Sequence, residues 1–82
     1  MPSEVTYGQL KSVLTSLGFR EQRKAKGVAL EHKPSDTLFL LRPYSEEDRL
    51  QVAEVAFVRL QLDERGLLPP QAFEELLAKA PA

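Results

Sequence analysis

The spacing of the apolar residues changes from a helical to a two-residue period after the first segment of this chain, and that change constrains the fold more than any other feature. Near the N-terminus, apolar residues recur at i, i+3, i+4 and i+7, the spacing of one helix face. These residues are Leu10, Val13, Leu14 and Leu17. From residue 28 the period is two, so that Val28, Leu30 and His32 would share one face of a half-buried strand. The chain must therefore combine helix and sheet.

The first helix has a predicted beginning and end. Thr6, with Gln9 three positions later, forms the pattern of a capping box. Gly18 follows the last apolar residue of the face, where a left-handed residue ends many helices. We therefore predict a helix from Thr6 to Gly18, with Phe19 folding back onto its apolar face.

Two or three antiparallel strands are expected next. Residues 37–41 are more apolar than residues 28–33, and we expect them to form the more central strand. Residues 34–36, Pro-Ser-Asp, supply the turn between these strands. The very polar segment from Arg20 to Lys24 is a candidate third strand, with Lys26 and Gly27 as its turn and Gly27 supplying a positive φ.

The second half of the chain predicts two helices. Ser45 and the acidic residues 46–48 resemble the start of a long helix that continues without Gly or Pro to Gly66. One face of this helix would carry Leu50, Ala53, Phe57 and Leu60. A strand within residues 57–62 is the alternative, because residues 58–62 alternate, but the length of the run favours helix. Pro70 opens a last short helix with Phe73 and Leu77 on its apolar face.

The predicted fold class is α+β, in the order α-β-β-β-α-α, with a small antiparallel sheet and helices packed on one face. The 82 residues, 43% hydrophobic and 28% charged, describe one globular domain, residues 1–82. Without cysteine there is no disulfide or thiolate metal site, and a single histidine excludes a multi-histidine metal cluster. We predict no metal and no cofactor. No apolar run reaches the roughly 18 residues that span a bilayer, and residues 1–4 do not resemble a secretory leader, so we predict a cytoplasmic protein with no membrane partner.

Positive charge is concentrated in the first half of the chain. Residues 1–42 hold seven basic and four acidic side chains, a balance of +3, whereas residues 43–82 hold four basic and eight acidic ones, a balance of −4. The net charge of −1 is therefore an average that does not exclude a nucleic-acid partner. The densest basic run is Arg20, Arg23, Lys24 and Lys26. On a sheet edge this run either contacts phosphates or only protects the edge from pairing with another strand.

His32 is the only side chain whose ordinary pKa suits proton transfer near neutral pH. With Lys33 and Arg23 as neighbours across the sheet, it would form an acid–base site for phosphodiester cleavage. The alternative is a packed or surface histidine with no chemical role. There is no glycine-rich phosphate loop and no pattern for nucleophilic catalysis. Among the aromatic residues, the phenylalanines are expected in the core and Tyr44 is expected at the surface.

The order of short motifs resembles the HicA toxin family. The shared elements are Leu17-Gly18-Phe19 at a helix end, a basic stretch ending in Lys26-Gly27, a strand ending at His32 before Pro34, and a second strand over residues 37–41. The resemblance covers roughly residues 6–79. It implies a double-stranded-RNA-binding-domain-like (dsRBD-like) fold, the activity of a bacterial messenger-RNA endoribonuclease (an mRNA interferase), and an antitoxin partner of a toxin–antitoxin system.

The sequence departs from this family at the catalytic residue. The family has Gly-Ser-His at the start of its central strand, and that histidine is the catalytic one. Here the segment is Gly27-Val28-Ala29, so Ala29 stands in the catalytic position, and His32 matches a second, more distal histidine. Either His32 has taken over the catalytic role, or the chain is a non-hydrolytic relative that keeps the fold and the binding face. The second interpretation is favoured.

Three functional hypotheses follow. The first is an RNA-binding domain that contacts the backbone more than the bases. Its phosphate contacts would come from Arg20, Arg23, Lys24, Lys26 and Lys33, with Gly27 in the turn. The second is a protein-interaction module, an inactive toxin relative held by an antitoxin-like partner, with no RNA role. The third is self-association through a sheet edge, and the sequence does not fix the oligomeric state.

Overall fold

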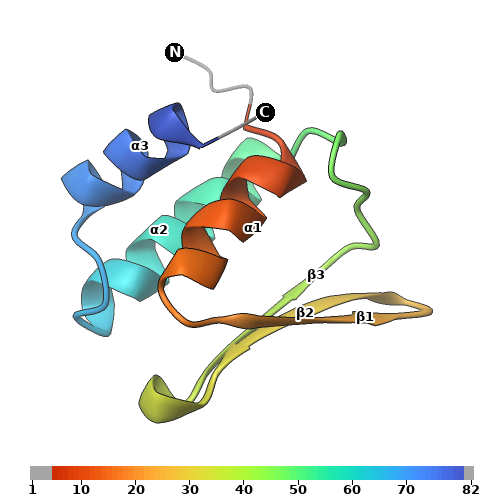
Figure 1. The fold of residues 1–82 in the computed structure, drawn as a ribbon, viewed down its shortest axis with the longest axis horizontal. Coiled ribbons are helices and arrows are strands. Elements are labelled where there is room, and N and C mark those ends of the chain that lie inside the picture. The colour runs from red at the N-terminus through yellow and green to blue at the C-terminus, as the bar shows by residue number, and fades with distance from the viewer. Residues whose placement is uncertain (1–4, 81–82) are drawn as a thin grey trace.

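Three antiparallel strands carry helices on one face only, as a computed structural model describing residues 5–80 shows (Figure 1). The elements are α1 (Tyr7–Ser16), β1 (Arg20–Lys24), β2 (Gly27–His32), a single 3-10 turn η1 (Lys33–Ser35), β3 (Thr37–Leu41), α2 (Val52–Glu64) and α3 (Pro70–Lys79). The helices α1 and α2 lie directly over the sheet, and α3 packs on both of them from the far side (Figure 1). The predicted α+β class and element order are confirmed.

The first helix begins and ends where the sequence predicts. Thr6 accepts a hydrogen bond from the backbone N–H of Gln9, and the Gln9 side chain accepts one from the Thr6 N–H, which completes the capping box. Gly18 has φ +102°, a conformation that favours glycine. The backbone N–H of Phe19 returns to the carbonyl of Leu14, and its ring is buried. Both predicted helix limits are therefore confirmed.

The strand order is β1-β2-β3, so β2 is central and β3 lies at an edge. The prediction that residues 37–41 form the more central strand is wrong. A meander of two hairpins places the strand that is second in sequence in the middle. The apolar character of β3 misled this prediction, because Leu38 and Leu40 are exposed on the face that no helix covers, and only the alternate residues Thr37, Phe39 and Leu41 are buried. The candidate third strand over residues 20–24 is confirmed as β1.

Gly27 is required for a different reason from the one predicted. It does not have a positive φ; among the described glycines only Gly18 and Gly66 do. A Cβ on Gly27 would lie 2.4 Å from the carbonyl oxygen of Leu41, closer than real Cβ atoms come to backbone. The neighbouring strand end therefore passes directly over Gly27, and the absence of a side chain makes that approach possible.

The second helix starts later than predicted, at Val52, after a turn and an extended stretch. Residues 45–48 form the turn, with the Ser45 N–H donating to Asp48 Oδ2 at 2.9 Å. This turn and the residue after it lie beside the start of α1. The N–H groups of Tyr7 and Gly8 donate to the carbonyls of Asp48 and Glu46, at 2.8 and 3.0 Å. The segment stays non-helical because its carbonyls satisfy free N–H groups in the first turn of α1.

Residues 57–62 are helical, but the buried face of α2 is not the predicted one. Its buried residues are Val58 and Leu62, whereas Phe57 and Leu60 are 54% and 51% exposed. The prediction that Phe57 belongs to the core is therefore wrong, although its ring edge touches Phe39 at a centroid distance of 6.2 Å. Apolar residues occur around most of this helix, so their spacing does not select one face.

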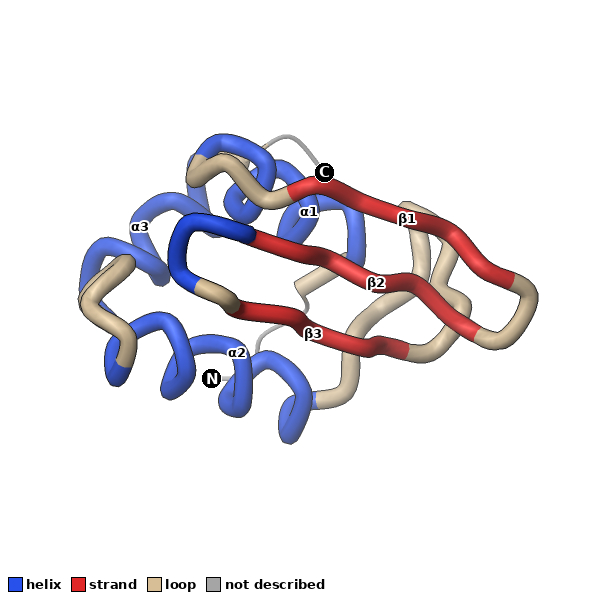
Figure 2. Tube along the Cα trace, turned by 90° about the horizontal axis from the view of Figure 1, so that it is seen from below, coloured by secondary structure: helices blue, strands red, loops and turns tan. Residues whose placement is uncertain are grey.

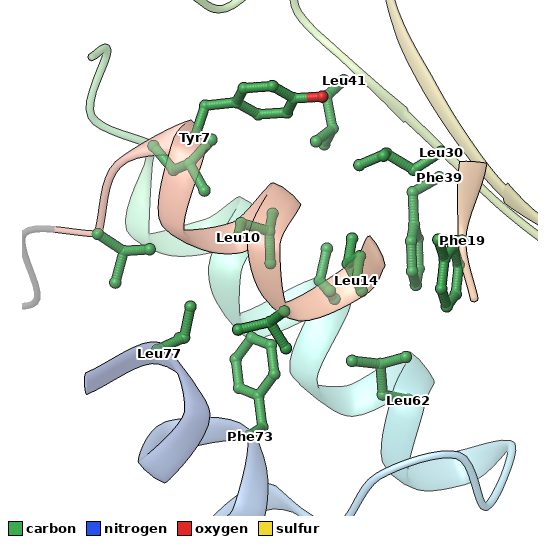
Figure 3. Packing of buried hydrophobic residues seen from close by; sticks show 14 of the residues in the cluster. Tyr7, Leu10, Leu14, Phe19, Leu30, Phe39, Leu41, Leu62, Phe73 and Leu77 are labelled. Atoms are coloured by element: carbon green, nitrogen blue, oxygen red, sulfur yellow. The ribbon is translucent and has the colours of Figure 1, made fainter. Parts of the chain in front are cut away.

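The core joins the sheet to all three helices (Figure 3). Its largest fully buried side chains include Tyr7, Phe39 and Phe73. Tyr44 is also buried, at 8% exposure, and stacks on Tyr7 with ring centroids 6.1 Å apart. The prediction that Tyr44 lies at the surface is wrong, because the segment after β3 turns back over the start of α1. Within residues 5–80, no helix is long and apolar enough to cross a bilayer.

Candidate nucleic-acid interface

The basic residues of β1 are divided between the two faces of the sheet. Successive side chains of a strand alternate, and Glu21 and Arg23 lie on the face that meets the helices, where both contact Tyr7. Arg20 and Lys24 therefore lie on the opposite face. Figure 2 looks onto this helix-free face, with the three strands in front of the helices.

Arg23, whose side chain is 47% exposed, is held by internal partners that the sequence does not predict. Its Nη1 donates to the Tyr44 carbonyl at 2.8 Å, and its guanidinium carbon lies 5.6 Å from the centre of the Tyr7 ring. Its Nε is 3.5 Å from Glu21 Oε2. The Tyr7 hydroxyl donates to the same carboxylate at 2.7 Å. Burial, together with this hydrogen bond to Glu21, holds the pKa of Tyr7 well above its usual value of 10.0.

The sequence did not reveal this cluster, which joins α1, β1 and the segment after β3. Its members are separated by up to 37 positions, from Tyr7 to Tyr44, and none belongs to a local motif. A second tyrosine hydroxyl, that of Tyr44, donates to Glu54, and burial raises its pKa above 10.0. The cluster fixes the inner side of the β1–β2 hairpin.

Three basic side chains of the hairpin remain available. Arg20, Lys24 and Lys26 are exposed, and within residues 5–80 none of them makes an ion pair or a side-chain hydrogen bond. Arg20 and Lys24 are four positions apart on one strand, which separates them by about 13 Å. Lys33 is also exposed, but it lies in η1, at the opposite end of β2 from Lys26. The register places Arg20 opposite Glu31, towards the same end of β2 as Lys33, so the structure brings Lys24 and Lys26 together and leaves Arg20 further along the same strand face.

A shallow hollow of about 220 Å³ lies beside Lys24 and Lys26. Lys24 and Lys26 line one side of it and Leu40 another. Ala29 also lines it and is itself only 6% exposed, because Gln22 and Leu40 flank it in the register of the strands. We call Arg20, Lys24, Lys26 and the hollow at Ala29 the basic hairpin surface.

His32 is placed on the other face of the sheet from Ala29, since three positions separate them on one strand. Its ring stacks on Phe19 with centroids 5.0 Å apart and lies against Gly18. Its Nδ1 is 2.7 Å from Ser35 Oγ, and Ser35 Oγ is 2.6 Å from Thr37 Oγ1. These contacts hold the η1 turn against the end of α1.

The expected acid–base site around His32 is not assembled. Arg23 pairs with Val28, four positions from His32 along β2 and therefore about 13 Å away. Arg23 also carries out the structural role described above. Within the described residues, no group of three or more histidine, aspartate and glutamate side chains is arranged to hold a metal ion.

Comparisons of the chain with protein-family models, with curated proteins and with solved structures give no match. A functional assignment therefore rests on the geometry and charge of the basic hairpin surface.

Proposed function

We propose that this protein binds RNA through the basic hairpin surface and does not hydrolyse it. The observation that carries the proposal is the position of three unpaired cations, Arg20, Lys24 and Lys26, on the edge of a sheet face that no helix covers. Cations without internal partners lose no protein contact when they meet phosphate, and each one releases counterions from the nucleic acid.

The HicA resemblance supports RNA as the ligand. The element order helix, three antiparallel strands, helix is the order that the resemblance implies. The position of the family's catalytic histidine, occupied here by Ala29, lies in the hollow beside Lys24 and Lys26. A chain that kept the binding face and lost the histidine would place its bound backbone at this hollow. Recognition of this kind follows the shape of the RNA more than its sequence.

Two observations argue against hydrolysis. Ala29 has no group that transfers protons, and His32 lies on the opposite face with its Nδ1 engaged by Ser35. Neither residue can therefore act as a general base at the basic hairpin surface. Incubation of the wild-type protein with RNA should leave the RNA intact. Cleavage by the wild-type protein that is lost in a His32→Ala variant would contradict this part of the proposal.

Binding is tested with a triple variant, Arg20→Gln, Lys24→Gln and Lys26→Gln. Its control removes an equal number of charges from the helical side, as Arg59→Gln, Arg65→Gln and Lys79→Gln. Because Arg59 pairs with Glu74 and Arg65 donates to the carbonyls of Ser35 and Asp36, circular dichroism verifies that this control is folded. The probes are a duplex of about 20 base pairs, long enough for a shape-reading domain, and a single strand of the same length. Fluorescence anisotropy over a range of salt concentrations gives the affinity and its salt dependence.

We expect the hairpin variant to lose at least about tenfold in affinity for the duplex, and the slope of log K against log salt to fall by about 2 to 3. The control should bind as the wild type does. Equal loss in both variants would mean that only net charge matters, and unchanged affinity in the hairpin variant would reject this surface. The alternative of a protein-interaction module with an antitoxin-like partner predicts no RNA binding by the wild type at any salt concentration.

A further inference from the structure

The two edges of the sheet differ in chemistry. The β1 edge has the sequence Arg-Glu-Gln-Arg-Lys, and charged side chains of this kind protect an edge from pairing with another strand. The β3 edge has the sequence Thr-Leu-Phe-Leu-Leu and no charge. Within residues 5–80 no strand pairs with the outer side of β3. One edge is therefore protected and the other is open.

Exposed apolar side chains gather around the open edge. Leu38 and Leu40 are 55% and 73% exposed on the helix-free face. On the other face, α2 runs alongside β3 (Figure 2), and its Phe57 touches Phe39. Leu60 lies one helical turn after Phe57 on the same side of α2. Three of the five large apolar side chains most exposed in the described part of the chain thus belong to β3 or touch it, namely Leu38, Leu40 and Phe57.

We propose that β3 pairs in antiparallel fashion with β3 of a second copy of this chain, so that two three-stranded sheets form one continuous sheet. A pairing about a two-fold axis requires a strand that is complementary to itself. With the axis at Phe39, the numbers of any two residues that face each other across the two copies add up to 78. Leu38 then faces Leu40 of the second copy, and Thr37 faces Leu41.

The charges that flank β3 favour this register. Asp36 precedes the strand and Arg42 follows it, and both are exposed. Asp36 caps η1 in a left-handed conformation, just outside the extended strand. Because the two numbers also sum to 78, each Asp36 would lie at the same end of the paired strands as Arg42 of the second copy. Opposite charges facing each other across strands are stabilising, and like charges are destabilising. Moving the axis to residue 38 or residue 40 loses this match.

The alternation of side chains between the two faces of β3 limits the possible registers further. A pairing with an odd sum would place Leu38 opposite an inward-facing residue and put the helices of the two copies on different faces. With a sum of 78, both α2 helices lie on the same side of the joined sheet. Phe57 of each copy, which touches Phe39 of its own β3, then lies on the same side of the joined sheet as Phe57 of the other copy. Leu38 and Leu40 of the two copies face each other on the opposite side.

The experiment is sedimentation equilibrium of the intact chain from micromolar to millimolar concentration, at low and high salt. The wild type should move from 9.2 kDa towards twice that mass, and high salt should not dissociate it, because the interface is mainly apolar. A variant with Leu38→Lys and Leu40→Lys places like charges opposite one another and should be monomeric. Since both side chains are exposed, circular dichroism should show an unchanged fold.

A register test uses Leu38→Lys with Leu40→Glu, which in this pairing places opposite charges against each other twice. This variant should dimerise where the double-lysine variant does not. The control, Gln22→Lys on the β1 edge, should dimerise as the wild type does. A monomeric wild type at all concentrations, or a double-lysine variant that still dimerises, would overturn the proposal. A monomeric Lys/Glu variant beside a dimeric wild type would overturn the register. The inference is independent of RNA binding.

Discussion

The imidazole of His32 lies against the backbone of Gly18: a Cβ on Gly18 would be 3.3 Å from both Cδ2 and Nε2 of that ring. The contact joins the end of α1 to the end of β2. Position 18 requires glycine for two reasons: the His32 ring leaves little room for a side chain, and the backbone has φ +102°. In this protein the single histidine is part of the packing between helix and sheet.

A Gly18→Ala substitution should therefore lower the free energy of unfolding by about 2 to 3 kcal/mol, since both strained backbone and a tight contact contribute. Gly66→Ala is the control: its φ is also positive, at +71°, but nothing lies within 4 Å of its added Cβ. That variant should cost about 1 kcal/mol. Urea denaturation measures both, and equal costs would mean that the His32 contact has no effect.

Gly27→Ala should destabilise the sheet more than either of these substitutions. The clashing atom is a backbone oxygen, that of Leu41, which cannot move without shifting the end of β3. We expect a loss of about 3 kcal/mol or more, in the range of strained core substitutions. A thermal melt within a degree of the wild type would contradict the close approach of the two strands.

The two phenylalanines of the second half should respond differently to truncation. Phe73 is 1% exposed, and Phe73→Ala should cost about 3 to 5 kcal/mol through lost burial and an internal cavity. Phe57 is 54% exposed, and Phe57→Ala should cost less than about 1 kcal/mol in the monomer. The comparison is made by urea denaturation at a concentration where the chain is monomeric. Similar costs would show that Phe57 is a core residue after all.

Neither of the two tyrosines should titrate near pH 10 in the folded protein. Burial is the main cause that raises the pKa of each, and hydrogen bonds to Glu21 and Glu54 add to it. The folded-state pKa is raised, so the stabilisation is fully present below pH 10.0 and is lost as pH rises above it. Tyrosinate absorbance should therefore appear together with loss of the circular dichroism signal. An ordinary titration in a protein that stays folded would contradict the buried positions of Tyr7 and Tyr44.

The ion pair between Lys11 and Glu46 should have a pH window. Lys11 Nζ donates to Glu46 Oε2 at 2.8 Å, which lowers the pKa of Glu46 below 4.5 and raises that of Lys11 above 10.5. The coupling is complete between these two values. It is lost as pH falls through the lowered pKa of Glu46 or rises through the raised pKa of Lys11. A double-mutant cycle with Lys11→Met and Glu46→Gln at several pH values measures it, and a coupling that did not change with pH would exclude an ionic origin.

The sequence by itself determined the local elements of this protein. The capping box at Thr6 and Gln9, the left-handed end at Gly18 and the proline start of the last helix depend on residues within a few positions of each other. Such signals act through hydrogen bonds and backbone preferences that do not need the rest of the fold. The α+β class followed from the two apolar periods for the same reason.

Only the tertiary structure decided which faces are buried. The sequence did not show that β2 is central, that Tyr44 is covered, that α2 buries Val58 instead of Phe57, or that α2 starts only at Val52. Each of these depends on contacts between segments far apart in the chain. The segment before α2, for example, stays non-helical because carbonyls of its turn accept hydrogen bonds from the first turn of α1.

The same distinction applies to the candidate site. Basic residues at positions 20, 23, 24 and 26 were visible in the sequence, but their availability was not. Strand alternation places Arg23 between Tyr7 and Glu21 and leaves Arg20 and Lys24 on the open face. The partners that immobilise Arg23 come from α1 and from the segment after β3, and only folding brings them to it.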